Sequence, residues 1–225
     1  MKKHIPNIIT LCNLVSGCAA TVFALKGEAL TALWLICAGN VFDFFDGMTA
    51  RLLGVASPIG RELDSLADVV TSGVAPSAML YVLLQTCGTG PVEALAVFVL
   101  AAFSGLRLAK FNLDTRQSTS FIGLPTPACG LFWAALAAGA GDAIVRTPHA
   151  ACYVGAGVAL SCWLLVSEVP MFALKFKTWG LRANALRYGF VAVSALLLAA
   201  LGVAGLSASV ALYVALSLVT QKRPC

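Results

Sequence analysis

Four aspartates between residues 43 and 68 are the residues of this chain whose types and spacing indicate chemistry. Asp43 and Asp46 stand three positions apart, and Asp64 and Asp68 stand four positions apart. In an α-helix both spacings place the two members of a pair on the same face. The segment 52–59 between them is short, so the two helices would be antiparallel neighbours. Both acidic faces can therefore converge on one cavity.

These carboxylates lie at the ends of apolar stretches, where charge is costly. One carboxylate at the centre of a membrane helix costs at least about 2.5–3.5 kcal/mol, and four together also repel one another. Shared protons would relieve part of this repulsion, and divalent cations would relieve more. A ligand set of oxygens without His or Cys suits Mg²⁺, Mn²⁺ or Ca²⁺ and disfavours Zn²⁺. Four carboxylates are enough to bridge two such ions.

The residues beside the aspartates indicate a phosphate ligand. The planar guanidinium of Arg51 suits a phosphate in a bidentate arrangement. Gly47 and Gly60 carry no Cβ, so a ligand or a backbone can approach them closely. Carboxylates for metal, an arginine for phosphate and a wall opened by glycine together describe a diphosphate site. Two-metal phosphoryl transfer uses this set of groups.

Two other interpretations of the acidic pairs stay open at this point. The aspartates could cap helices in the headgroup region, which the paired spacing and the adjacent glycines disfavour. They could also belong to a cation or proton transporter, which would place the carboxylates near the middle of the bilayer and favour inverted repeats. Here they stand near one end of their apolar segments, beside Arg51 and Arg61.

The composition indicates that membrane helices position these groups. Hydrophobic residues make up 60% of the 225 residues and charged residues 11%, against roughly 45–50% and 25% in soluble domains. Because backbone polar groups in lipid must be satisfied internally, the apolar segments are predicted to be helices. The predicted fold is therefore all-α, a polytopic bundle of about eight transmembrane helices in a single domain over residues 1–225. The segments are 11–26, 29–50, 63–86, 92–111, 124–141, 150–167, 187–204 and 206–220.

The basic residues predict the orientation of this bundle. With a cytoplasmic N-terminus, only Lys26 and Arg146 of the 15 basic residues lie on the opposite side. Because cytoplasmic loops carry the excess of Lys and Arg, both termini and the acidic site are predicted to face the cytoplasm. The predicted location is a bacterial or archaeal cytoplasmic membrane, in contact with its lipids. No basic run exceeds Lys222-Arg223, so nucleic acid is not an expected partner. Small residues in 134–141 would allow a homodimer.

The acidic segment resembles the signature of the CDP-alcohol phosphotransferase family, D-x2-D-G-x2-A-R-x8-G-x3-D-x3-D. Members of that family move a substituted phosphate from a CDP-alcohol to an acceptor hydroxyl and release CMP. The resemblance implies a six-helix core, to which the last two segments would add a C-terminal hairpin. The fixed positions of the signature are Asp43, Asp46, Gly47, Ala50, Arg51, Gly60, Asp64 and Asp68.

The resemblance also implies roles for these residues. Asp43, Asp46, Asp64 and Asp68 would hold two divalent cations, Mg²⁺ or Mn²⁺ with Ca²⁺ also compatible, and Asp43 and Asp64 would bridge them. Asp68 would in addition be the general base that takes the proton of the acceptor hydroxyl.

The remaining positions of this segment would bind the donor. Gly47, Arg51 and Ser57 would contact the CDP moiety of the CDP-alcohol. Gly60 would allow this moiety to pack closely against the helix. The lipid tails of the donor would then lie between helices in the bilayer.

Four further stretches, 5–14, 104–112, 121–128 and 166–171, resemble the integral-membrane phosphatidylserine synthases of that family. This implies CDP-diacylglycerol as donor and L-serine as acceptor, giving phosphatidylserine and CMP. The carboxylate of serine requires a cation and its ammonium requires an acceptor such as Asn112 or Glu168. A glycerol 3-phosphate or inositol-type acceptor would also require cations, and Arg107 and Lys110 could simply anchor the helix, so these alternatives stay open. The candidate acceptor-binding residues are Arg107, Lys110, Asn112 and Arg187.

Overall fold

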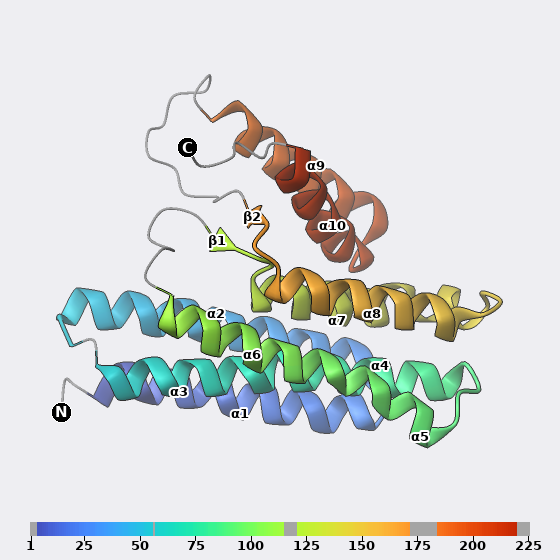
Figure 1. Ribbon diagram of the computed structural model, residues 1–225, viewed down its shortest axis with the longest axis horizontal. Coiled ribbons are helices and arrows are strands. Elements are labelled where there is room, and N and C mark those ends of the chain that lie inside the picture. Colours follow the sequence, from blue (N-terminus) through green and yellow to red (C-terminus); the bar gives the residue numbers. More distant parts are fainter. Residues whose placement is uncertain (1–3, 56, 115–120, 172–183, 220–225) are drawn as a thin grey trace.

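The computed structural model describes residues 4–55, 57–114, 121–171 and 184–219, and these ranges are almost entirely helical (Figure 1). Helices α1 to α6 lie side by side, α7 and α8 run along them, and α9 and α10 form a hairpin that leaves the bundle at an angle. The helices are α1 (Ile5–Leu25), α2 (Ala29–Leu53), α3 (Pro58–Asp68), α4 (Ala75–Thr86), α5 (Pro91–Ala94), α6 (Val99–Leu113), α7 (Thr126–Val145), α8 (Ala150–Val166), α9 (Ala185–Leu201) and α10 (Ala204–Val219).

The all-helical membrane architecture predicted from the sequence is confirmed. Within the described residues, five helical segments are long and apolar enough to cross a membrane, and three shorter apolar helices follow. Each predicted apolar segment corresponds to one of these helices. The first begins at Ile5 and the third at Pro58, several residues before the predicted starts, because polar residues at those ends continue the helix.

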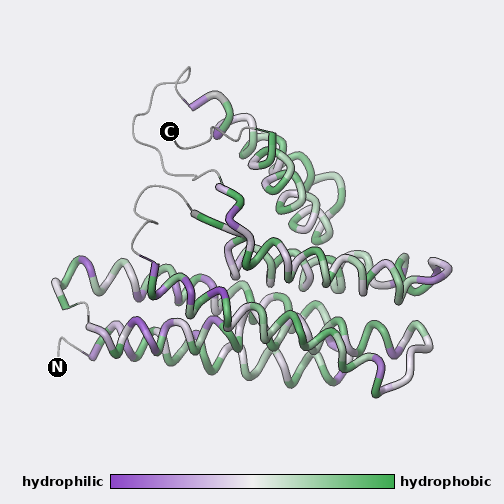
Figure 2. The backbone as a smooth tube through the Cα atoms, in the orientation of Figure 1, coloured by the Kyte–Doolittle hydropathy of each residue, from purple (hydrophilic) through white to green (hydrophobic). Residues whose placement is uncertain are grey.

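Hydrophilic residues gather at one end of the bundle. Figure 2 shows hydrophilic stretches on α2, α3 and α6 toward the end where the N-terminus lies, while the helices are otherwise mainly hydrophobic. The basic residues Lys2, Lys3, Arg116, Lys175, Lys177, Arg182, Lys222 and Arg223, which contribute to the predicted orientation, lie outside the described residues.

A wider helical turn separates α3 from α4 and was not predicted from the sequence. Residues Val69–Val74 form a π-helix directly after Asp68. Thr71 of this π-helix is fully buried, and it packs against Gly17 of α1 and Gly39 of α2. A Cβ added at Gly39 would lie 2.6 Å from Thr71 Cγ2, and one added at Gly17 would overlap Thr71 as well. These close contacts hold the helices that carry the aspartates together at mid-length.

A two-stranded ribbon joins the segments before α7 and after α8. Strands β1 (Phe121–Ile122) and β2 (Pro170–Met171) are antiparallel, with Phe121 opposite Met171. Gly123 follows with a φ of +75° and donates its N–H to Val169 O at 2.8 Å. The ribbon is an exception to the helices predicted throughout, because two residues per strand leave no periodic pattern in the sequence.

The C-terminal hairpin packs on α7. Its turn contains Gly202 at a φ of +56°, within the region where the turn was predicted. Ser207 Oγ donates to Phe132 O at 2.8 Å, and a Cβ on Gly139 would overlap the start of α10. Small residues of the 134–141 stretch thus serve packing within the chain. A homodimer through this stretch stays a prediction.

Candidate active site

The structure brings three of the four aspartates together. Asp43 lies on α2, and Asp64 and Asp68 lie on α3. One carboxylate oxygen from each of the three lies within 4.8 Å of the others. Asp68 is buried, with 6% of its surface exposed, and Asp43 and Asp64 are half-buried. Such an arrangement of like charges requires a positive ligand or shared protons.

Asp46 lies close by but is held in a different way. It is 6% exposed, and Asp46 Oδ2 accepts a 2.5 Å hydrogen bond from Thr10 Oγ1 of α1. Thr10 Oγ1 is also 3.1 Å from Pro6 O. The hydroxyl of Thr10 therefore orients this carboxylate on the side of α1.

A polar network from α1 supports Asp68. Asn13 Nδ2 donates to Asp68 Oδ1 at 3.3 Å, and Asn13 Oδ1 accepts from Thr71 Oγ1 at 2.8 Å. No role for Thr10, Asn13 or Thr71 was predicted from the sequence. A signal was present, because Thr10 and Asn13 are polar residues three positions apart in an apolar helix and so share one face.

The acidic group fits a divalent cation. Asp64 Oδ1 is buried and has no hydrogen-bond partner among the described residues, which is unusual for a buried oxygen. The three side chains offer only carboxylate oxygens, the donors that Mg²⁺, Mn²⁺ and Ca²⁺ prefer. A cation bound here would coordinate Asp64 Oδ1 and would neutralise part of the negative charge of the three carboxylates.

A cleft of about 360 Å³ opens beside the acidic group. The predicted contacts of the CDP moiety, Gly47, Arg51, Ser57 and Gly60, all line it, together with Asp46 and Asp64. Thr10, Pro6 and Asn7 of α1 complete one wall. The lining of the cleft thus combines carboxylates suited to metal with basic and small residues.

Two features of this cleft suit a diphosphate. Arg51 Nε donates to Gly47 O at 3.0 Å, and because a guanidinium has five N–H donors, this bond leaves four others. Helix α3 starts at the cleft, where Ser57 Oγ accepts from Gly60 N at 3.1 Å. A helix N-terminus carries a partial positive charge and favours anions.

The four predicted acceptor-binding residues do not all lie at one site in the structure. Arg107 and Lys110 line a separate cavity of about 70 Å³. Asn112 Nδ2 instead donates to Ser65 Oγ at 2.9 Å and ties α6 to α3. Arg187 lies on α9, where its Nη1 donates to Asn184 Oδ1 at 2.6 Å, and it is not among the described residues that line the small cavity.

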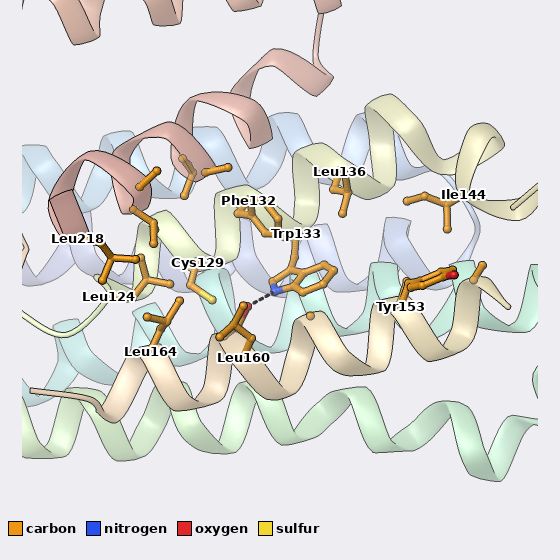
Figure 3. Close-up of a pocket in the computed structure, with 18 of the residues that line it drawn as sticks. Leu124, Cys129, Phe132, Trp133, Leu136, Ile144, Tyr153, Leu160, Leu164 and Leu218 are labelled. Carbon is orange, nitrogen blue, oxygen red and sulfur yellow. Dashed lines mark hydrogen bonds between the residues drawn. The ribbon is translucent and has the colours of Figure 1, made fainter. Parts of the chain in front are cut away.

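A larger cavity lies elsewhere and is apolar. It has a volume of about 510 Å³ between α7, α8 and α10. Figure 3 shows the Trp133 ring between α7 and α8, with its indole N–H donating to Ser161 Oγ at 3.1 Å. No charged side chain occurs among its described lining residues, so it does not suit a nucleotide or a diphosphate.

Comparison with known proteins supports the resemblance noted in the acidic segment. A family model described as CDP-alcohol phosphatidyltransferase matches residues 3–167. The chain belongs to the CDP-alcohol phosphatidyltransferase family. The matched region contains all four aspartates and runs through α8, so it covers six of the eight apolar helical segments. Hairpin α9–α10 lies beyond it.

Curated relatives extend this comparison. The chain is 41% identical over 130 residues to the CDP-diacylglycerol–serine O-phosphatidyltransferase of Bacillus subtilis, covering 57% of this chain and 72% of that protein. Proteins of the same name from Helicobacter pylori and Mycobacterium tuberculosis are 39% and 33% identical, over 56% and 74% of this chain. The match spans 54% and 60% of these two relatives, little more than half of their length.

The predicted family is therefore confirmed, and with it an integral membrane location. A CDP-alcohol phosphatidyltransferase acts on a donor that carries a diphosphate, which agrees with the arginine, glycines and carboxylates of the cleft.

Proposed function

We propose that this protein transfers the phosphatidyl group of CDP-diacylglycerol to the hydroxyl of L-serine, producing phosphatidylserine and CMP. The observation that carries the proposal is the convergence of Asp43, Asp64 and Asp68 beside a cleft that contains Arg51. The names of the curated relatives support serine as the acceptor. An acceptor of the glycerol 3-phosphate or inositol type is the alternative within the same reaction class.

Two divalent cations, Mg²⁺ or Mn²⁺, are proposed to bind the acidic group. Asp43, Asp64 and Asp68 would hold them, and Asp46 lies close enough along α2 to take part. When bound, the cations would neutralise the diphosphate and stabilise the negative charge of the departing CMP.

The chain's own residues supply the other parts of the reaction. Asp68 is proposed as the general base that accepts the proton of the serine hydroxyl, because an alcohol is a poor nucleophile while protonated. Asn13 orients its carboxylate by donating to Oδ1. Arg51 and the N-terminus of α3 are proposed to hold the diphosphate, and Gly47 and Gly60 leave room for it.

An apolar groove is proposed to take a lipid chain of the donor. It has a volume of about 460 Å³ and runs along α1 and α2, with Ile8, Leu11 and Phe42 in its lining. Ile8 and Leu11 neighbour Asn7 and Thr10 along α1, and both of these line the cleft. A donor with its diphosphate in the cleft can therefore place a tail in the groove.

The setting of the reaction is proposed from the sequence. The basic residues favour a site and both termini on the cytoplasmic side of a bacterial or archaeal membrane. We treat residues 1–225 as a single domain, since α10 packs on α7 of the matched region. A cation or proton transporter, the non-enzyme alternative, is disfavoured by membership in an enzyme family.

The first test is release of CMP from CDP-diacylglycerol in detergent micelles. We expect release that requires both L-serine and Mg²⁺ or Mn²⁺, with phosphatidylserine as the lipid product. Release with glycerol 3-phosphate or inositol in place of serine would contradict the serine assignment. Absence of release with any alcohol would contradict the enzyme assignment.

Replacement of Arg51 by alanine is expected to weaken donor binding. A hydrogen bond to a charged group contributes about 1.5–3 kcal/mol, so KM for CDP-diacylglycerol should rise about 10-fold to 100-fold. KM for serine should change much less. The control is Arg146→Ala, because Arg146 is exposed at the far end of α7. Equal donor KM values in Arg51→Ala and the unmodified protein would show that Arg51 does not bind the diphosphate.

A further inference from the structure

Two polar side chains, Asn13 and Thr71, contact each other in the interior of the bundle beside the acidic group. Both are fully buried. Asn13 lies on α1, and Thr71 lies in the π-helix that follows Asp68. Burial of a polar group is costly unless the group is hydrogen-bonded, and polar groups inside membrane bundles usually have a function. The reaction steps proposed above use Asn13 and leave Thr71 without a role.

The hydroxyl of Thr71 holds Asn13 at two atoms. Thr71 Oγ1 lies 2.8 Å from Asn13 Oδ1 and 3.1 Å from the backbone oxygen of Asn13. Both atoms are acceptors, so in either case the hydroxyl donates its one proton to Asn13. The other end of the amide, Asn13 Nδ2, donates to Asp68 Oδ1 at 3.3 Å. Thr71, Asn13 and Asp68 therefore form a continuous chain of hydrogen bonds.

Only one orientation of the Asn13 amide satisfies both of its neighbours. An ionised carboxylate can only accept hydrogen bonds, so Asp68 requires the NH₂ end, and the Thr71 hydroxyl donates to the oxygen end. The bond to Oδ1 restrains rotation of the Asp68 carboxylate and so fixes the direction of its Oδ2. A general base must keep its oxygen within hydrogen-bond reach of the proton that it takes. The Thr71 hydroxyl can thus affect the base without contacting it.

The packing encloses Asn13 and Thr71. A Cβ added at Gly39 of α2 would lie 2.7 Å from Asn13 Oδ1 and 2.6 Å from Thr71 Cγ2, and one added at Gly17 of α1 would overlap Thr71 Oγ1. The backbones of two helices thus approach the pair closely. The π-helix is a further indication, because π-helices are rare and frequently occur at functional sites.

We propose that Thr71 is a positioning residue for the general base. Its hydroxyl holds the amide of Asn13, and this amide orients the Asp68 carboxylate toward the acceptor hydroxyl. The inference rests on the proposed function and deepens it, because it extends the control of the base to a side chain in the π-helix. Thr71 acts through Asn13, and its contribution is to the rate of the chemical step.

The first test removes the hydroxyl and keeps the shape of the side chain. In Thr71→Val we expect kcat for CMP release to fall about tenfold, because a buried hydrogen bond that orients the base is lost. KM for CDP-diacylglycerol should stay nearly unchanged, since Thr71 is not among the described residues that line the donor cleft. Thr71→Ser, which retains the hydroxyl, should recover most of kcat.

The matched control is Ser77→Ala. It also removes a fully buried hydroxyl, one that donates at 2.8 Å to the backbone oxygen of Gly73 in the same π-helix. Ser77 has no printed contact with Asn13, so this variant should retain full activity. Melting curves of each purified variant separate a folding defect from a slower reaction.

A double variant distinguishes positioning from packing. Asn13→Leu removes the residue through which Thr71 is proposed to act, so adding Thr71→Val to Asn13→Leu should lower kcat no further. A packing role would lower kcat by a similar factor in both backgrounds. Replacing both partners by apolar groups is tolerated better than leaving one unpaired. The double variant therefore keeps this comparison available even if Thr71→Val alone fails to fold.

A readout without turnover follows the Asn13 amide directly by nuclear magnetic resonance. In protein labelled with a heavy nitrogen isotope in asparagine, the side-chain amide signal of Asn13 is identified by its absence in Asn13→Leu. This signal should shift in Thr71→Val and in Asp68→Asn, because each removes one partner of the amide. It should stay in place in Ser77→Ala.

The outcomes separate this inference from the proposed function. The role of Thr71 alone is overturned if the unmodified protein releases CMP while Thr71→Val keeps its kcat or its Asn13 signal, or if the double variant is slower than Asn13→Leu. A lower kcat in Thr71→Val that Thr71→Ser recovers, with no further fall in the double variant, supports the inference. Absence of release from the unmodified protein with any alcohol overturns the proposed function and this inference together.

Discussion

Replacement of Asp68 by asparagine is expected to abolish CMP release, lowering kcat by at least about 10²–10⁴-fold, the usual contribution of a general base. The change removes a proton acceptor and one carboxylate of the group in which Asp43, Asp64 and Asp68 converge. It alters the shape of the side chain very little. Asp68 is 6% exposed and hydrogen-bonded to Asn13, so the position of its carboxylate in this group is fixed.

Two measurements identify the cause of this loss. Binding of CDP-diacylglycerol by the Asp68→Asn protein should be retained in large part, because Asp68 is not among the described residues lining the donor cleft. The control Asp142→Asn changes an exposed aspartate near the end of α7 and should retain full activity. A kcat for Asp68→Asn close to that of the unmodified protein would remove Asp68 from the reaction.

Removal of divalent cations is expected to stop turnover and to destabilise the protein. Without cations, three carboxylates within 4.8 Å of one another repel, and Asp64 Oδ1 lacks a hydrogen-bond partner among the described residues. A ligand present at 100 times its Kd stabilises a folded protein by about 2.7 kcal/mol. We therefore expect treatment with EDTA to lower the Tm in micelles and Mg²⁺ or Mn²⁺ to restore both Tm and activity.

The Asp64→Asn variant distinguishes binding at this group from a general salt effect. Its activity should be lost, and Mg²⁺ should raise its Tm much less than that of the unmodified protein. Asp142→Asn should respond to Mg²⁺ as the unmodified protein does. Zn²⁺ should restore little activity, since the ligand set contains no His or Cys. Full activity in EDTA, or an equal Mg²⁺ response of Asp64→Asn, would rule out a metal site formed by these aspartates.

The amino-acid sequence by itself determined the helical membrane fold and the reaction class. Apolar runs long enough to cross a bilayer allow only one local structure, because lipid offers no hydrogen-bond partners to an open backbone. The spacing of Asp43 with Asp46, and of Asp64 with Asp68, placed each pair on one helix face without knowledge of the packing. The CDP contacts predicted from the family resemblance, including Arg51 and Ser57, also line one cleft.

Only the tertiary structure decided which side chains from other helices contact the aspartates, and which distant residues line the same cavity. Thr10 and Asn13 reach the aspartates across a helix interface, and sequence spacing along α1 says nothing about what faces it. Glu168 stands 61 positions after Arg107, and a ribbon of two residues per strand brings the two segments into one cavity. Contacts between such distant positions depend on how whole helices pack, whereas periodicity reports only on the local environment of each helix.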